Sequence, residues 1–216
     1  MPIHYTRQEE HWNTWSHASG ILLALVCGVL LLWWSFKEGD GWTRLGVALY
    51  LFGMLGSYTA STIYHALPQT WPSRRVWRKF DHAAIYWHIA GSYSPVTLVA
   101  LREQGYWGWS LFSFVWFCAL VGTTLSFIKL RDHSHIETLC YCGMGLSVLV
   151  CFKPLIDSVS TAAIAWIVAE GVCYLTGALF YSLNKRPYMH SVFHFFVLAG
   201  SICHLVAVWD ILLLYI

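Results

Sequence analysis

Long apolar stretches dominate the sequence, and they constrain its fold more than any other feature. Seven windows are each long enough for a helix to cross the hydrocarbon core of a bilayer; they cover residues 18–36, 45–66, 82–101, 107–128, 139–155, 161–183 and 191–214. Only 11% of the 216 residues are charged, whereas soluble domains carry about 25% charged residues. The sequence therefore predicts an all-α polytopic membrane protein with seven transmembrane helices, in which residues 1–216 form a single domain.

The Lys and Arg residues between the windows indicate an orientation. If the N-terminus is cytoplasmic, nine basic residues lie on the cytoplasmic side: Arg7, Arg74, Arg75, Arg78, Lys79, Lys129, Arg131, Lys185 and Arg186. Four then lie outside: Lys37, Arg44, Arg102 and Lys153. By the positive-inside rule, we expect residues 1–16 to be a short cytoplasmic segment and the C-terminus to lie outside. The expected location is the cell membrane (the inner or plasma membrane).

Local sequence signals add three expectations about the connections and the packing of the spans. Residues 68–79 are rich in Pro, Trp and basic residues and are expected to form a loop. The pair Lys153-Pro154 is expected to end the fifth span. Glycines in the later spans are predicted to let helices pack closely; they are Gly143, Gly145, Gly171 and Gly177.

Composition also narrows the classes of partner and cofactor. A formal net charge of +2 is too small to indicate binding to a nucleic acid, so membrane lipids are the expected partners. Seven cysteines lie inside apolar windows and form no CxxC pair. We interpret them as small buried side chains, not as disulfides or thiolate ligands.

Polar residues inside a membrane are costly and point to function. In the predicted orientation, the first, second, third and seventh spans bring polar residues to the cytoplasmic leaflet: Glu10, Asn13, His17, Ser61, His65, Asp81, His190 and His194. These residues come from separate helices, and nothing in the composition requires them to lie at one depth. The coincidence predicts a shared site.

The spacing of three histidines suggests what this site binds. His190 and His194 are four residues apart and share one face of a helix. With His65 from another helix they can form a three-nitrogen site with an open fourth position, as in catalytic zinc sites. The pair alone is weak, because 11 histidines in 216 residues produce about half of one such pair by chance. Asp81 alone is better explained by the favourable position of an acid in the first turn of a helix.

Three motifs together resemble a known family. They are E-x2-N-x3-H, S-x3-H followed by an Asp at the start of the next span, and H-x3-H; the residues are Glu10, Asn13 and His17, then Ser61, His65 and Asp81, then His190 and His194. The run Ile89–Pro95 is also similar to the third span of that family. The chain resembles the hemolysin III family, the bacterial branch of the progestin and adipoQ receptor (adiponectin-receptor-like) proteins, which are related to ceramidase-like membrane hydrolases.

The resemblance implies a seven-helix fold with a zinc ion (Zn²⁺) near the cytoplasmic side, bound by His65, His190 and His194. It also implies that Asp81 contacts the water on the zinc and that Ser61 lies beside it. Three functions remain open: a zinc-dependent hydrolase of lipid amides or esters that acts in membrane lipid homeostasis, a non-catalytic sensor with a structural zinc, and a cytolytic activity.

Three polar residues fall outside this pattern. Glu170 lies in the middle of the sixth span, where it is expected to pair with His88 or His204, to be protonated, or to line a water-filled cavity. His88 is interpreted as a hydrogen-bonded core histidine or as part of a second polar layer below the metal. His204 lies about 15 Å beyond His194 along the last span and is not expected to reach the same metal.

Overall fold

A computed structural model describes residues 5–129, 135–183 and 186–216, and in these ranges the chain contains helices and no strands. Arg131 and Lys185, used above for the orientation, lie outside the described residues. The long elements are α1 (Arg7–Leu23), α2 (Val29–Glu38), α3 (Gly41–Ala66), α4 (Pro72–Pro95), α5 (Trp107–Lys129), α6 (His135–Gly145), α8 (Thr161–Ser182) and α9 (Met189–Tyr215). The short ones are η1 (Ala24–Gly28), η2 (Val96–Ala100), η3 (Leu146–Cys151) and α7 (Phe152–Ser158).

These elements combine into seven long helical rods. Six segments of the described chain are long and apolar enough to cross a membrane: Arg7–Glu38, Gly41–Ala66, Trp107–Ile128, Ile136–Ser158, Thr161–Ser182 and Met189–Tyr215. The seventh rod, α4 with η2, is more polar, and most of its residues from His82 onward are buried among the other helices. A helix that other helices enclose does not need an apolar surface. The expected all-α polytopic architecture is confirmed.

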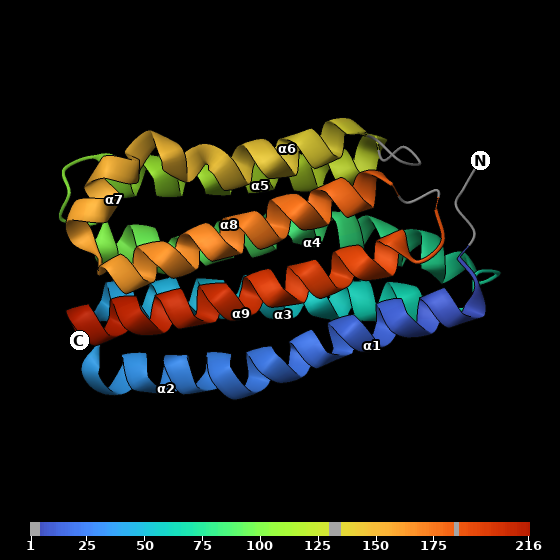
Figure 1. Cartoon of the computed structure of the whole chain (residues 1–216), viewed down its shortest axis with the longest axis horizontal. Coiled ribbons are helices and arrows are strands. Elements are labelled where there is room, and N and C mark those ends of the chain that lie inside the picture. The colour runs from blue at the N-terminus through green and yellow to red at the C-terminus, as the bar shows by residue number, and fades with distance from the viewer. Residues whose placement is uncertain (1–4, 130–134, 184–185) are drawn as a thin grey trace.

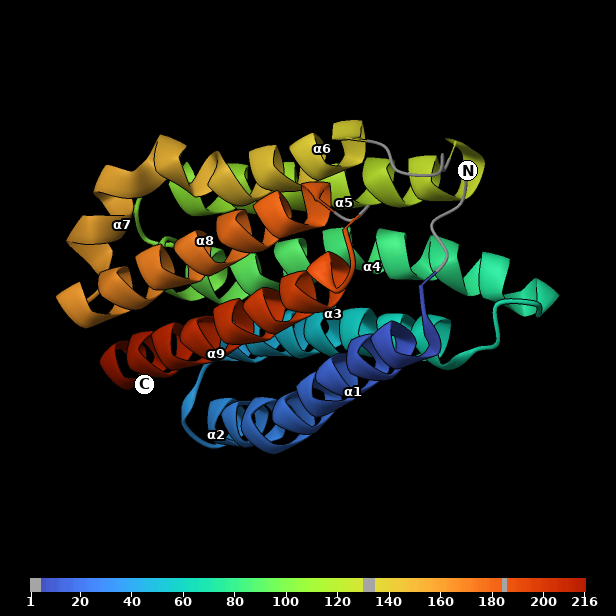
Figure 2. The ribbon, with the colours of Figure 1, turned by 45° about the vertical axis from the view of Figure 1, so that its right-hand side comes forward.

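The rods run roughly parallel to the long axis of the molecule, so that their ends gather at two opposite faces (Figure 1). One layer contains α9, α8 and the α6–α7 rod, the layer behind it contains α3, α4 and α5, and α1 and α2 flank α9 and α3 (Figures 1 and 2). The helix pairs α3–α4 and α8–α9 make the most extensive contacts. The start of α1 and the end of α9 lie at opposite ends of the bundle (Figure 1), as an odd number of crossings requires.

Two helices begin earlier than the apolar windows predicted. Helix α1 starts at Arg7 because Thr6 and Glu9 form a capping box, so most of the expected N-terminal segment 1–16 belongs to this helix. Helix α4 starts with Pro72 in its first turn, so residues 72–79, expected in a loop, are helical. Hydropathy missed both extensions because they are polar, and some of their polar residues, such as Glu10 and Asn13 of α1 and Arg74 of α4, are buried inside the bundle.

The expected helix end at Lys153-Pro154 is also wrong. Helix α7 continues through both residues to Ser158. Pro154 is tolerated because it lies in the first turn of α7, just after the 3-10 segment η3, where a backbone N–H is not needed by the helix.

The glycine at the closest contact between helices, Gly53, is not one of the four that the sequence predicted. A Cβ at Gly143, Gly145 or Gly171 would meet no atom within 4 Å, and only Gly177 lies against a neighbour, Phe196, at 3.1 Å. At Gly53 of α3, in contrast, a Cβ would overlap the backbone carbonyl of Trp87 in α4. The small residue is therefore required where α3 meets α4.

We expect Gly53→Ala to destabilise the bundle by about 2–3 kcal/mol or more, because overpacking against backbone cannot be relieved by a rotamer change. Gly56→Ala, one turn further along α3, is the matched control, since its Cβ would lie at an ordinary 3.5 Å from the Trp87 ring. Thermal unfolding of the two purified variants in detergent measures the difference. Equal midpoints for both variants would show that α3 and α4 are not in this close contact.

Candidate metal centre

Three buried histidines converge at the end of the bundle where α1, α4 and α9 begin. His65 comes from the last turn of α3, and His190 and His194 lie one turn apart at the start of α9. The Nε2 atom of His190 is 3.3 Å from Nε2 of His65 and 3.1 Å from Nε2 of His194. Within the described residues, these three form the group that could hold a metal ion, with ligand atoms within 4.8 Å of one another.

Helix α1 fixes the protonation of two of the rings. Nδ1 of His65 lies 2.7 Å from the Glu10 carboxylate, and Nδ1 of His194 lies 3.2 Å from the backbone carbonyl of Asn13. Both oxygens can only accept, so each Nδ1 carries the hydrogen and donates it. The Nε2 atoms therefore present lone pairs toward the centre, as they do in metal-binding histidines.

This arrangement fits a divalent cation. Lone pairs that face one another repel unless a cation or a proton lies between them. Metal–nitrogen distances of about 2.0–2.1 Å in a tetrahedral site place two nitrogens about 3.3 Å apart, close to the 3.1 and 3.3 Å separations observed. His65, His190 and His194 can thus bind a metal, as the sequence predicted.

Glu10, Asn13 and His17, the residues of the E-x2-N-x3-H motif, surround the three histidines and contact them. Glu10 also accepts a hydrogen bond from Arg74 of α4, so its charge is balanced in the buried site. The side-chain oxygen of Asn13 accepts from Ser191 at 2.6 Å. The His17 ring stacks on His194 with centroids 3.7 Å apart and does not belong to the ligand group of the described residues.

Sequence reasoning missed several contacts of this centre. The Ser16 hydroxyl lies 3.3 Å from Nδ1 of His194, and Ser191 stands directly beside His190 in the sequence. The Tyr5 ring stacks on His190 with centroids 4.9 Å apart, and its burial raises the pKa of the phenol well above the usual value. The sequence marked Arg74 only as one of the basic residues on the cytoplasmic side. No sequence signal predicted its hydrogen bond to Glu10.

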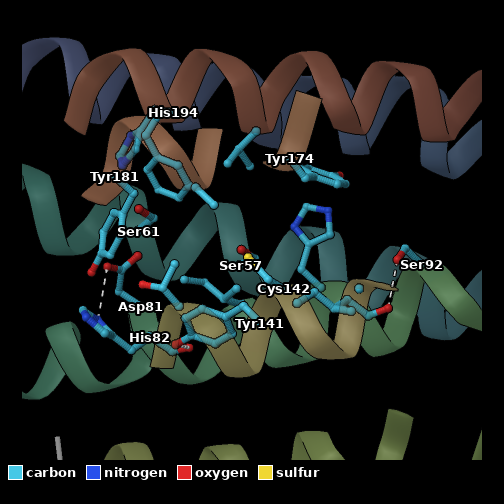
Figure 3. Close-up of a pocket in the computed structure, with 18 of the residues that line it drawn as sticks. Ser57, Ser61, Asp81, His82, Ser92, Tyr141, Cys142, Tyr174, Tyr181 and His194 are labelled. Atoms are coloured by element: carbon cyan, nitrogen blue, oxygen red, sulfur yellow. Dashed lines mark hydrogen bonds and ion pairs between the residues drawn. The ribbon is translucent and has the colours of Figure 1, made fainter. Parts of the chain in front are cut away.

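Asp81 and Ser61 lie beside the histidines on the wall of one large cavity (Figure 3). The cavity has a volume of about 1270 Å³, and His190 and His194 also line it. Ser61 of α3 is placed to donate a hydrogen bond to the Asp81 carboxylate of α4. The Asp81 side chain is only 13% exposed. The structure therefore brings together all four helices that the sequence motifs predicted to meet.

The cavity opens in two directions. At the end near the histidines, its lining includes the exposed residues Trp71 and Arg75. Along its side, it is lined by Leu149 of η3 and Val168 of α8, which are 58% and 50% exposed on the apolar outer surface. These two places are the candidate entrances, for an apolar chain from the lipid side and for polar groups at the end.

The three polar residues outside the motifs lie deeper in the same cavity, which all of them line. Glu170 pairs with His204, whose Nδ1 lies 2.7 Å from the carboxylate, so one of the expected pairings is confirmed. Nε2 of His88 lies 3.4 Å from the Ser201 hydroxyl. His88 thus belongs to a second polar layer and is also hydrogen-bonded.

Comparison with known proteins places the chain in a family. Residues 5–205 match the family model described as "Haemolysin-III related". The chain is 31% identical to Hemolysin-3 of Bacillus cereus over 90% of its own length and 87% of that protein, and 32% identical to the Hemolysin-3 homolog of Bacillus subtilis over 91% of each. It is 26% identical to the human "Monocyte to macrophage differentiation factor" over 96% of its own length and 86% of that protein. The chain therefore belongs to the Haemolysin-III related family, and it is a multi-pass membrane protein.

Proposed function

We propose that this protein is a zinc-dependent hydrolase of lipid amides or esters that acts in membrane lipid homeostasis. The observation that carries the proposal is a three-histidine site, two of whose rings, His190 and His194, line a cavity large enough for an acyl chain. Within the described residues, the ligand group contains three side chains and no fourth. Three protein ligands with one open position are typical of catalytic zinc sites, whereas structural sites are usually closed by four.

Each residue of the centre has a proposed role. Zinc held by His65, His190 and His194 would supply Lewis acidity toward a carbonyl and would lower the pKa of water from about 15.7 to about 7. Asp81 would accept the proton of the attacking water and pass it to the leaving group. Ser61 would donate its single hydroxyl hydrogen to Asp81 and so orient that carboxylate toward the water. The side opening would admit the lipid chain.

A second function is favoured by a different observation. The metal ligands and their partners Glu10 and Asn13 tie together the ends of α1, α3 and α9. A bound ion would therefore stiffen this end of the bundle, as a non-catalytic sensor or regulator with a structural zinc requires. The adjacent Asp81 and the connected cavity have no role in that function, which is why we favour the hydrolase.

Lipid mass spectrometry tests the choice. The purified zinc-loaded protein is incubated with an extract of bacterial membrane lipids, with and without a chelator, and fatty acids released from amides and esters are quantified. We expect release that the chelator abolishes and that added zinc restores. A chelator that lowers the unfolding temperature while no lipid is hydrolysed in any sample would favour the structural zinc and would contradict the hydrolase.

Glu10→Gln should weaken zinc binding about 10–100-fold, because the carboxylate that orients a metal-binding imidazole contributes this much to metal affinity. Glu9→Gln is the matched control: Glu9 is the neighbouring acid on α1, but it caps the helix and accepts from the backbone N–H of Tyr188. Competition with a fluorescent zinc chelator gives the two affinities. The assignment of Glu10 to the metal centre is wrong if both variants bind zinc equally.

A further inference from the structure

A group of polar residues lies near the middle of the bundle, beyond the metal centre. We call it the inner cluster; it consists of Tyr58, His88, Glu170, Tyr174, Ser201 and His204. These residues come from α3, α4, α8 and α9. Polar side chains at this depth are expensive in a membrane protein and are retained for function by default. The metal centre does not use any of them.

Ser201 holds one half of the inner cluster together. Its hydroxyl accepts from Tyr58 at 2.7 Å and lies 3.2 Å from the Tyr174 hydroxyl and 3.4 Å from Nε2 of His88. A serine hydroxyl has one hydrogen and two lone pairs. If Ser201 donates to His88, then Tyr174 donates to Ser201, and the oxygen of Tyr174 keeps lone pairs for another donor.

Glu170 and His204 form the other half. The carboxylate and Nδ1 of His204 share one hydrogen bond. The Glu170 side chain keeps 14% of its surface exposed and lines the cavity. Within the described residues, Nε2 of His204 and the hydroxyl of the adjacent Tyr50 have no hydrogen-bond partner although both are buried. The polar groups of this region are thus not all satisfied by the protein.

The cavity connects the inner cluster with the metal centre. His194 and His204 are ten residues apart on α9, which corresponds to about 15 Å along the helix. Between the two polar ends the cavity wall is mostly apolar and includes Ile85, Ile89 and Val197 beside Ser57. In Figure 3, His194, Ser61 and Asp81 lie at one end of the pocket, and Tyr174 lies further along it. A ligand that fills this space meets polar groups at both ends and an apolar wall in between.

We propose that the inner cluster binds a hydroxyl group on the apolar chain of a lipid ligand. The Glu170 carboxylate and the Tyr174 oxygen both have lone pairs at the cavity, so a ligand group that can donate a hydrogen bond fits this end. A hydroxyl fits better than an ammonium group, because the His204 ring already pairs with the carboxylate and an additional charge is costly at this depth. The inference deepens the proposed function by naming the ligand class, but binding to the inner cluster does not require hydrolysis.

The test compares two acids that differ by one hydroxyl. Dodecanoic acid and ω-hydroxydodecanoic acid have extended chains of about the required length, and their common carboxylate makes all other contacts equal. Binding to the full-length protein in detergent is measured by titration calorimetry. We expect the hydroxylated acid to bind about tenfold more tightly, as a hydrogen bond to a charged group allows. Equal affinities, or no binding of either acid, would overturn the proposal without any reference to enzymatic turnover.

Variants locate the preference. Glu170→Leu and the milder Tyr174→Phe and Ser201→Ala should each reduce the preference for the hydroxylated acid, while the affinity for dodecanoic acid is kept. Glu137→Leu is the control, since Glu137 is also partly buried but does not line the cavity. A preference that survives all three cluster substitutions places the hydroxyl elsewhere and refutes the assignment. The ratio of affinities in the wild-type protein decides the case even if one variant fails to fold.

Discussion

His65→Ala is expected to remove most of the bound metal from the purified protein. His65 is the only ligand that α3 contributes, and its Nε2 atom faces that of His190 at 3.3 Å. Two imidazoles from neighbouring turns of α9 remain, which is too few for a stable zinc site. Loss of an outer partner already costs about 10–100-fold in affinity, so loss of a direct ligand should cost more. Metal analysis by inductively coupled plasma mass spectrometry gives the zinc content per chain.

His204→Ala is the matched control for this experiment. His204 is also a buried histidine of the bundle, yet it pairs with Glu170 and not with the metal ligands. We expect this variant to retain the wild-type zinc content. Stoichiometric zinc in His65→Ala would contradict the three-histidine centre, and equal zinc loss in both variants would indicate a general effect on folding. Thermal unfolding of each variant without metal separates these two outcomes.

The sequence predicted that three histidines converge, because the spacing of two of them reflects helix geometry. An i, i+4 pair must share one face of a helix, and the predicted topology brought His65 to the same end of the bundle as His190 and His194. The polar residues Glu10 and Asn13 could be assigned to the same end for that reason. Their particular partners, His65 and His194, depend on the rotation of α1 about its axis, which no spacing rule specifies.

Other features of the structure could not be predicted from hydropathy, because hydropathy indicates only which residues face lipid. The first turns of α4 are polar, yet Arg74 is buried there because Glu10 balances its charge. The partner of Glu170 could be narrowed to His88 or His204 but not chosen, since both lie at a similar depth. The contact at Gly53 depends on which faces of α3 and α4 meet, and sequence periodicity is uninformative for helices that are buried on most sides.

Asp81→Asn is expected to lower the rate of lipid hydrolysis by about 10²–10⁴-fold, the usual contribution of a general base. Asparagine has nearly the same size as aspartate and can still contact Ser61, but it cannot accept a proton at neutral pH. Because Asp81 is not one of the three metal ligands, the zinc content should remain that of the wild type. The measurement pairs the release of fatty acid with metal analysis on the same preparation.

Hydrolysis rate and zinc content, measured together, distinguish a catalytic role of Asp81 from a structural one. If Asp81 is the base of a hydrolase, the Asp81→Asn variant loses activity and keeps its metal. If Asp81 only supports the fold, the variant either loses activity and metal together or keeps both. Asp157→Asn is the control, because Asp157 is an exposed acid on α7 whose partner is Lys153, at the opposite end of the bundle. If Asp81→Asn hydrolyses lipid as fast as Asp157→Asn, then the residue beside the centre does not carry the proton, and the proposed chemistry fails even if zinc is bound.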